Sequence, residues 1–258
     1  MLRATFLHSP GVGPETERRL WRQGASDWET FLRNPERWNL PVGKRELLIN
    51  VLEESAEALE KKDFPYFARM LPSQHRWRVF PDVIDKIGYL DIETNGDTHA
   101  GSVTVVGLYT DGQMYSFVKG MNLHLFPGIV EQCDALVTFN GNAFDIPILE
   151  SLFPKAGLRN KIHIDLCPTL RRLGLKGGLK IVEDIVGIER SSETHGLNGW
   201  DAVRLWYQYQ RGNKEALEIL LKYNKEDCVN LEPLMQHAYQ GLKAQLFDQN
   251  CRQGAETQ

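Results

Sequence analysis

The sequence has little cysteine and no long run of apolar residues. Only four of its 258 residues are cysteines, and they stand far apart, without the close pairs of zinc sites or disulfide frameworks. No segment approaches the roughly 18 consecutive apolar residues of a membrane span, and the apolar part of the N-terminus is too short for a secretory signal. We therefore expect a cytoplasmic protein that makes no contact with membranes.

The composition is otherwise that of an ordinary globular protein, with 42% hydrophobic and 25% charged residues. The length suffices for one large domain, or for a small domain and a medium one. The formal net charge of -4 argues against binding of a polyanion over the whole surface, although one face can still be basic.

A change of pattern near Phe80-Pro81 divides the chain. Before it, apolar residues recur with helical spacing, and we expect helices at 27–35 and 43–62. From Ile87 onward, strand-like and helix-like segments alternate. We predict a helical domain at 1–80, a second domain at 81–245 and a flexible, polar tail at 246–258.

The helical domain contains the tight turn Pro10-Gly11-Val12-Gly13-Pro14, followed by a helix that Pro14 can begin. This segment resembles a helix-hairpin-helix element. In such an element Gly11 and Gly13 let backbone N–H groups approach a nucleic-acid phosphate, and Arg18 would flank that phosphate. A packed helical turn with solvated arginines is the alternative interpretation, and one turn of this kind does not decide between the two.

In the second domain three strands in a meander precede an alternation of strands and helices. The expected strands are 87–93, 102–109, 114–118, 135–139 and 163–166, and the expected helices are 123–133, 146–152 and 214–239. This order predicts an α/β fold: a mixed five-stranded sheet with helices on both faces. The ribonuclease H-like fold has this order.

Two motifs place carboxylates at the edge of this sheet. Asp91 and Glu93 stand two residues apart on a strand, so their side chains point to the same face. Asp145 follows the strand that ends at Asn140-Gly141, and Pro147 fixes the start of the next helix near it. Carboxylates on one face favour a site for hard divalent cations. An aspartate at a helix start can also be a simple N-cap, and that alternative stays open for Asp145.

A third motif lies on the long helix near the C-terminus. Tyr223 and Asp227 are four residues apart and share a face of that helix. Glu226 is a competing ligand, but it points about 100° away from Asp227 around the helix. Asp165, after the fifth strand, either supports the site from behind or caps the next helix, and we favour the cap.

Together, Asp-x-Glu at 91–93, Asn-x-x-x-Phe-Asp at 140–145 and Tyr-x-x-x-Asp at 223–227 resemble the motifs of the DEDD exonucleases of the DnaQ-like group, in the variant with tyrosine. The resemblance covers residues 87–232. The sequence around these motifs, including residues 179–190, is similar to that of YprB-type ribonuclease H-like domains. Those domains typically have histidine where this chain has Tyr223. The resemblance implies a metal-dependent 3'-5' exonuclease that hydrolyses DNA or RNA, with a single-stranded 3' end as substrate.

In the chemistry that this resemblance implies, carboxylates bind two divalent cations, Mg²⁺ or Mn²⁺, which activate water and neutralise the leaving 3'-oxygen. We assign Asp91 to bridging both ions, and Glu93 and Asp227 to the ion that activates the water. Tyr223 would orient that water, because a phenol with a pKa near 10 is a poor base. Asp145 would lie on the leaving-group side.

The residues of this domain that we expect to contact nucleic acid are Thr94, Asn140, Phe144, Arg171 and Lys176. Arg171 and Lys176 belong, with Arg172 and Lys180, to a basic segment around the flexible Gly177-Gly178 pair, which is equally compatible with a solvated face. Two other functions stay open: a catalytically silent nucleic-acid-binding module, and another metal-dependent phosphoesterase. The presence of all four carboxylates argues against the silent module.

Overall fold

The computed structural model describes the backbone of residues 1–255 and the side chains of residues 1–246. The chain forms two compact units. The helical unit comprises Met1–Ile84 together with the chain from Tyr239 onward, and the second unit comprises Asp85–Ala238.

These limits differ from those expected from the sequence. The helical unit continues beyond residue 80 to Ile84 and includes the short helix α5 (Phe80–Val83), in which Phe80 and Val83 are buried. The ring of Tyr239 packs against Phe80 and Trp77, with ring centroids 5.5 and 5.9 Å apart, so residues 239–245 belong with the helical unit. Helix α12 (Leu231–Ala255) runs across most of the segment predicted to be a flexible tail, and residues 256–258 lie outside the described residues.

Two helices of the helical unit, α2 (Trp28–Arg33) and α4 (Phe64–Met70), begin at aspartate caps. Asp27, for example, accepts a hydrogen bond from the N–H of Thr30 over 2.8 Å at the start of α2. The predicted helices at 27–35 and 43–62 correspond to α2 and α3. The bounds are α1 Pro14–Arg22, α2 Trp28–Arg33, α3 Val42–Glu60 and α4 Phe64–Met70.

The predicted phosphate-binding turn is present as a turn. Gly11 has a φ of 77°, and Gly13 is the N-cap of α1. Before the turn stands a short 3₁₀ helix, Leu2–Ala4, where a helix-hairpin-helix element would have its first α-helix. Arg18 donates from Nη2 to Oε2 of Glu15 over 2.7 Å. Phosphate binding by Gly11, Gly13 and Arg18 stays a prediction.

A buried ion pair lies in the core of the helical unit. Glu17 and Arg78 are both 1% exposed, and Nη1 of Arg78 lies 2.9 Å from Oε1 of Glu17. The same carboxylate oxygen accepts hydrogen bonds from the hydroxyl of Thr5 and the N–H of Phe6, each over 2.8 Å. The buried negative charge is therefore neutralised and hydrogen-bonded where it lies.

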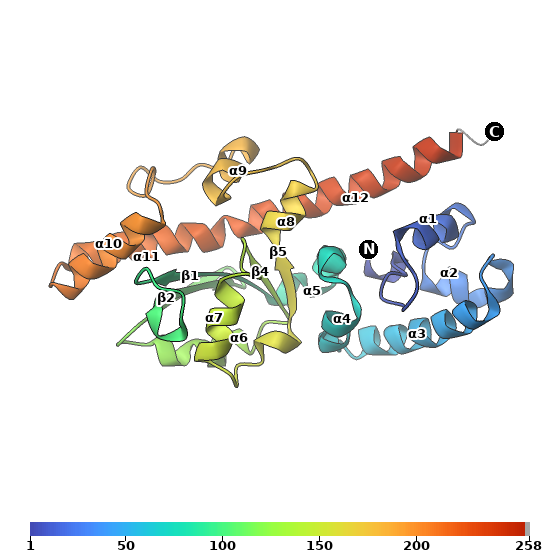
Figure 1. Cartoon of the computed structure of the whole chain (residues 1–258), viewed down its shortest axis with the longest axis horizontal. Coiled ribbons are helices and arrows are strands. Elements are labelled where there is room, and N and C mark those ends of the chain that lie inside the picture. Colours follow the sequence, from blue (N-terminus) through green and yellow to red (C-terminus); the bar gives the residue numbers. More distant parts are fainter. Residues whose placement is uncertain (256–258) are drawn as a thin grey trace. The chain divides into compact units, whose positions relative to one another are not determined.

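The second unit contains the mixed five-stranded sheet, in the order β3-β2-β1-β4-β5. Figure 1 labels its strands β1, β2, β4 and β5. Strand β1 pairs antiparallel with β2, and β2 pairs antiparallel with β3. On its other side β1 pairs parallel with β4, which pairs parallel with β5. The bounds are β1 Ile87–Thr94, β2 Val103–Thr110, β3 Gln113–Val118, β4 Ala135–Thr138 and β5 Ile162–Asp165. The predicted fold class is confirmed.

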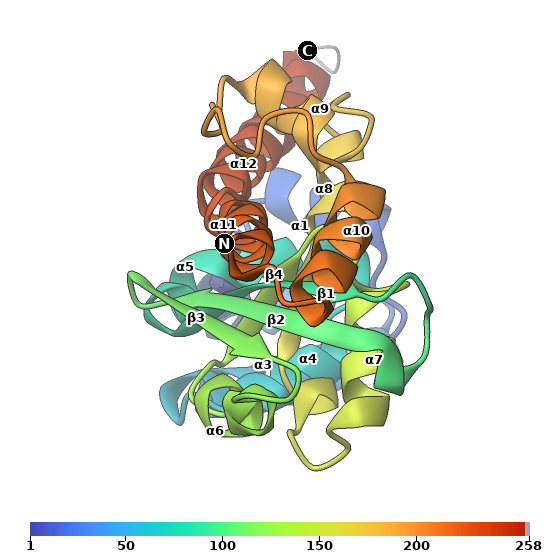
Figure 2. The ribbon, with the colours of Figure 1, turned by 90° about the vertical axis from the view of Figure 1, so that its left-hand side faces the viewer.

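Helices cover both faces of the sheet (Figure 2). On one face α6 and α7 enclose a core that includes Leu90, Ile92 and Phe126. On the other face α10 and α11 enclose a second core that includes Val105 and Trp206. The bounds of the helices in this unit are α6 Phe126–Val130, α7 Asp145–Leu152, α8 Leu166–Arg171, α9 Leu179–Val186, α10 Gly199–Gln210 and α11 Lys214–Val229.

The prediction of one helix over 214–239 was wrong. Helix α11 ends at Val229, with Asn230 as its C-cap, and α12 begins at Leu231. Pro233 supplies the physical reason, because proline has no N–H to donate and its ring clashes with the carbonyl four residues earlier, that of Val229.

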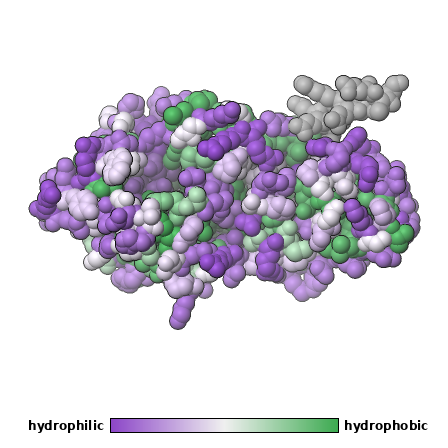
Figure 3. All heavy atoms as spheres, viewed as in Figure 1, coloured by the Kyte–Doolittle hydropathy of each residue, from purple (hydrophilic) through white to green (hydrophobic). Residues whose placement is uncertain are grey.

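Hydrophilic side chains cover most of the face shown in Figure 3, with hydrophobic ones in small areas between them. None of the helices in the described part of the chain combines the length and the apolar composition that crossing a membrane requires.

Candidate metal centre

Strand β1 presents two carboxylates to the face of the sheet that α10 and α11 cover. Side chains alternate along a strand, and Leu90 and Ile92 are buried in the core on the opposite side, with α6 and α7. Asp91 and Glu93 therefore share the other face. Glu93 lies opposite Val105, which belongs to the core under α10 and α11.

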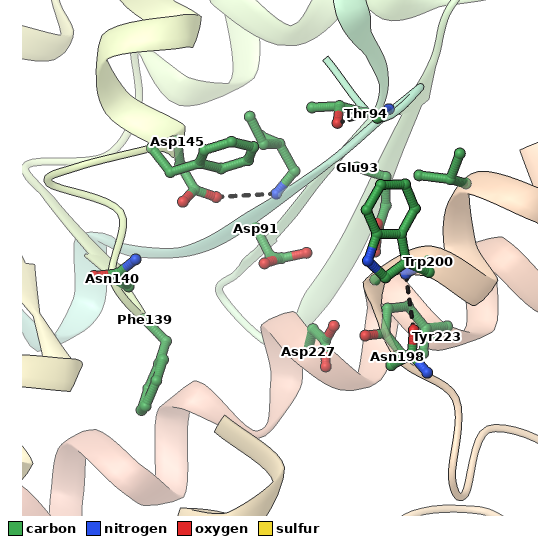
Figure 4. Close-up of a pocket in the computed structure, with 15 residues that line it drawn as sticks. Asp91, Glu93, Thr94, Phe139, Asn140, Asp145, Asn198, Trp200, Tyr223 and Asp227 are labelled. Carbon is green, nitrogen blue, oxygen red and sulfur yellow. Dashed lines mark hydrogen bonds between the residues drawn. The ribbon is translucent and has the colours of Figure 1, made fainter. Parts of the chain in front are cut away.

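Helix α11 brings Asp227 to this pair. One carboxylate oxygen each of Asp91, Glu93 and Asp227 lies within 4.8 Å of the other two. Figure 4 shows these side chains around a common space, with Asp145 to one side and Tyr223 beside Asp227. Acidic residues far apart in the sequence thus meet in one small volume.

A glycine in β2 allows α11 to approach the sheet this closely. Gly107 lies opposite Asp91, and a Cβ atom there would lie 2.2 Å from Oδ1 of Asn224 and 2.6 Å from Sγ of Cys228. Because residue 107 has no side chain to fill that space, Asn224 can reach Asp91. Its Nδ2 donates to Oδ2 of Asp91 over 2.9 Å and to the main-chain oxygen of Asp91 over 3.3 Å. Gly107 and Asn224 thereby fix the carboxylate of Asp91.

Asp145 is buried and is tied to β1. The parallel pairing of β1 with β4 ends at Tyr89 and Val137, and beyond it the N–H of Ile92 donates to Oδ1 of Asp145 over 3.1 Å. The N-cap of α7 is Phe144, and Asp145 is the first residue of the helix proper. Asp145 is therefore not the N-cap that the sequence left open.

The carboxylates share an environment that disfavours their ionised forms. Burial raises the pKa of Asp91 and of Glu93 well above ordinary values, and the charges of Asp227 and Asp145 raise both further. Burial raises the pKa of Asp145 to about 7, and it raises the pKa of Asp227 against the effect of Arg190. A divalent cation relieves such repulsion, and carboxylate oxygens are the ligands that Mg²⁺ and Mn²⁺ prefer. The donor set therefore fits these ions.

A buried arginine that the sequence analysis missed holds Asp227. Arg190 donates from Nε and Nη2 to the two carboxylate oxygens of Glu183 over 2.6 and 2.7 Å, and Nη2 also donates to Oδ1 of Asp227. These side chains are at most 9% exposed. Asn230 donates from Nδ2 to Glu183 over 3.0 Å, so the network joins α9 and the end of α11. No local spacing signals these contacts, because their members meet only in the folded chain.

Glu226, the competing ligand on α11, makes local hydrogen bonds instead. Its Oε1 accepts from the N–H of Ser191 over 3.2 Å, and its Oε2 accepts from the hydroxyl of Thr194. Glu226 therefore holds the loop between α9 and α10, and it is outside the cluster that Asp91, Glu93 and Asp227 form.

Asp165 is the N-cap of α8, as we favoured, and accepts from the N–H of Cys167 over 3.0 Å. Its two oxygens also accept from the N–H groups of Asn140 and Asn142, over 2.8 and 3.1 Å. Asp165 thus shapes the loop of the second motif, where Asn140 has a φ of 67°.

The carboxylates open into a pocket of about 660 Å³, which Tyr223 also lines. Three residues predicted to contact nucleic acid line it as well: Thr94, Asn140 and Phe144. Arg171, in the last turn of α8, and Lys176, in the loop before α9, are exposed and are not among its lining residues. Their contact with nucleic acid stays a prediction.

An exposed tryptophan on the wall of the pocket was also missed. Trp200, the second residue of α10, is 73% exposed and lines the pocket. A capping box fixes this helix start: Asn198 accepts from the N–H of Trp200 over 2.9 Å (Figure 4), and its own N–H donates to Asp201 over 2.9 Å. The spacing Asn-x-x-Asp at 198–201 is a signal that would have predicted this helix.

Comparison with known proteins agrees with this geometry. The family model described as RNase_H superfamily matches residues 88–239, more than half of the chain. The chain belongs to the RNase H superfamily. Comparisons with curated proteins and with solved structures gave no match.

RNase H-like domains are typically nucleases that use divalent metal ions, so this membership indicates a nuclease or a related phosphoesterase with a nucleic-acid substrate. The matched range contains all three carboxylate motifs and every residue of the pocket. The acidic cluster supplies the kind of donor set that RNase H-like nucleases require.

Proposed function

We propose that this chain is a metal-dependent 3'-5' exonuclease that hydrolyses phosphodiester bonds at single-stranded ends of DNA or RNA. The observation that carries the proposal is the cluster of Asp91, Glu93 and Asp227, whose oxygens lie within 4.8 Å of one another beside an open pocket. Buried carboxylates this close repel one another. Groups whose pKa values are so perturbed gather at functional sites, where a ligand offsets the cost.

The residues of the site have different roles in this proposal. Asp91, Glu93 and Asp227 would hold the ions. The Oδ1 of Asp145 accepts a hydrogen bond from the N–H of Ile92, so Asp145 would offer its other oxygen, Oδ2, to an ion. When bound, two divalent cations supply an activated water and neutralise the charge that develops on the leaving 3'-oxygen. Tyr223 lines the same pocket. Burial and the nearby charge of Asp227 raise its pKa, which favours orienting a water over accepting its proton.

Aromatic side chains around the pocket support a single-stranded substrate. Phe139 lies on one side of the carboxylates and Trp200 on the other (Figure 4), and Phe144 also lines the pocket. Unpaired bases stack on such rings, whereas the bases of a duplex stack on one another. The resemblance of the motifs to those of DnaQ-like exonucleases supports attack from the 3' end.

The test is incubation of the protein with Mg²⁺ or Mn²⁺ and 5'-labelled single-stranded DNA, RNA and duplexes. We expect a ladder that shortens by single nucleotides from the 3' end. Asp227→Asn should remove this activity. Glu218→Gln, an exposed carboxylate on the same helix, should leave it unchanged.

Other outcomes distinguish the alternatives. Internal cuts would replace the proposal with an endonuclease, and binding without cleavage would indicate a silent nucleic-acid-binding module. Hydrolysis by Asp227→Asn at the rate of the unaltered protein would show that the chemistry lies elsewhere.

A further inference from the structure

Lys180 lies inside the candidate site. It is the second residue of α9, which begins after the turn at Gly177, where φ is 125°, and Gly178, its N-cap. Lys180 lines a cavity of about 390 Å³ whose walls also include Asp91, Tyr223 and Asp227. Of the basic residues around the glycine pair that the sequence analysis named, it is the one that lines this cavity.

The ammonium group of Lys180 is held by neutral oxygens. Nζ donates to the hydroxyl oxygen of Tyr223 over 2.9 Å and to the main-chain oxygen of Leu197. Nζ lies 4.3 Å from the centroid of the Tyr223 ring. Within the described part of the chain, no carboxylate lies at ion-pair distance from it. The hydrogen bonds of Lys180 therefore hold a phenol and a main-chain carbonyl, and its charge acts on the carboxylates of Asp227 and Glu93 from beyond ion-pair distance.

This contact fixes the direction in which the hydroxyl group of Tyr223 can donate a hydrogen bond. An ammonium group has donors and no acceptor, so the phenol oxygen must accept in this hydrogen bond. The hydroxyl proton of Tyr223 then has to point away from Lys180. Tyr223 lines the pocket of the carboxylates, and that is where a free donor finds a water or a substrate oxygen.

We propose that Lys180 is a positioning residue, which holds the phenol of Tyr223 so that its O–H donates into the pocket. This inference rests on the proposed nuclease function and deepens it. Tyr223 then acts as a hydrogen-bond donor that orients a water or a substrate oxygen. Lys180 contributes to the reaction through Tyr223.

The test is a double-mutant cycle with Lys180→Met, Tyr223→Phe and the double variant, assayed in Mn²⁺ on a 5'-labelled single-stranded oligonucleotide. We expect Lys180→Met to lower kcat by at least about tenfold, because a small displacement of an orienting group has effects of this size, with KM nearly unchanged. The double variant should be no slower than Tyr223→Phe alone, since both changes remove one interaction. Lys180→Arg, which keeps a donor, should recover part of kcat.

Lys225→Met is the matched control, because Lys225 is exposed on α11 and its loss changes the net charge equally. It should leave kcat unchanged. Thermal melting of each variant shows whether lost activity reflects lost folding, and Lys180→Arg carries the test if Lys180→Met does not fold.

The outcomes separate the two proposals. If the unaltered protein shows no metal-dependent cleavage, the proposed function fails. If it cleaves and Lys180→Met retains its kcat, the role of Lys180 alone is refuted. Multiplicative losses in the double variant would mean that Lys180 acts independently of Tyr223, which also overturns the inference.

Discussion

In the helical unit the buried carboxylate of Glu17 lies 2.9 Å from Arg78, whereas in the RNase H-like unit the carboxylates of Asp91, Glu93 and Asp227 lie within 4.8 Å of one another. In the described chain, Arg190 is the basic residue at ion-pair distance from this cluster, and it contacts Asp227. The first unit encloses one acid with a basic partner of its own, whereas in the second unit three acids lie together beside a pocket and Arg190 pairs with one of them. Burial of an acid therefore points to function where its neighbours leave it uncompensated.

The largest effect that this comparison predicts is that of Asp91→Asn. We expect hydrolysis to fall by about four orders of magnitude, or ~5 kcal/mol of transition-state stabilisation, because an amide is a poor ligand for the ions. The Tm of the metal-free protein should rise, since one of the mutually repelling groups is gone while Asn224 keeps an acceptor at position 91. Rate measurements and melting curves check both. A lower Tm would mean that Asp91 is primarily a structural residue.

Glu17→Ala should have the opposite effects: it should lower stability and leave activity unchanged. The change leaves Arg78 buried without its partner, and removing one member of a buried pair costs about 3–5 kcal/mol of unfolding free energy. Activity per folded molecule should not change, because Glu17 belongs to the helical unit. Urea denaturation provides the measurement.

The control for this change is Glu15→Ala on the same helix, whose carboxylate is 76% exposed and pairs with Arg18. It should lower the free energy of unfolding far less than Glu17→Ala does, because a solvent-exposed ion pair contributes little to stability. Equal losses for the two variants would erase the distinction between the buried and the exposed pair.

The two units should also respond to pH with opposite signs. Burial lowers the pKa of His8, in the helical unit, from 6.5 to about 4, so stability is lost as the pH falls between these values, by roughly 3 kcal/mol in full. Burial raises the pKa of Asp145 to about 7, so stability is lost as the pH rises from the ordinary carboxyl value toward 7.

Measurement of the free energy of unfolding across this pH range checks the sign of both effects. His8→Leu should reduce the loss of stability on the acid side, and Asp145→Asn should reduce the loss of stability toward neutral pH. Mg²⁺ should offset the loss of stability toward neutral pH in the unaltered protein. If Asp145→Asn were no more stable than the unaltered protein at pH 8, the account of the carboxylate environment would be wrong.

The smallest effect concerns Trp200. We expect Trp200→Ala to raise KM for a single-stranded oligonucleotide about fivefold, or ~1 kcal/mol, because it removes one stacking surface for a base. The KM of Trp200→Phe should lie between those of the unaltered protein and Trp200→Ala. The difference in KM between the unaltered protein and Trp200→Ala should vanish for an oligonucleotide whose 3'-terminal nucleotide has no base. A loss that persists with this substrate would show that Trp200 does not contact that base.

Much of the fold could be predicted because it follows from local patterns. The strand at 87–93 and the turn before Met114 lie in short segments with clear alternation or turn signals, and the structure has β1 at Ile87–Thr94 and β3 at Gln113–Val118. The same alternation predicted that Asp91 and Glu93 share a face. Helix α9 went unpredicted, although Gly187, with a φ of 84°, marks its end.

What supports the candidate site could not be predicted, because it depends on tertiary contacts. Arg190 reaches Asp227 across 37 residues, and Asn224 reaches Asp91 across 133 residues. Gly107 reads as an ordinary strand glycine until α11 is seen to lie against it. The helix break at Asn230 was foreseeable, because Pro233 stood in the sequence.

Titration of Mn²⁺ into the protein, with the bound ion measured by electron paramagnetic resonance, shows whether carboxylates from β1 and α11 bind divalent cations together. We expect two Mn²⁺ per chain, and loss of this binding in the folded Asp91→Asn/Asp227→Asn variant. Absence of Mn²⁺ uptake by the unaltered protein, or equal uptake by that variant, would contradict this expectation.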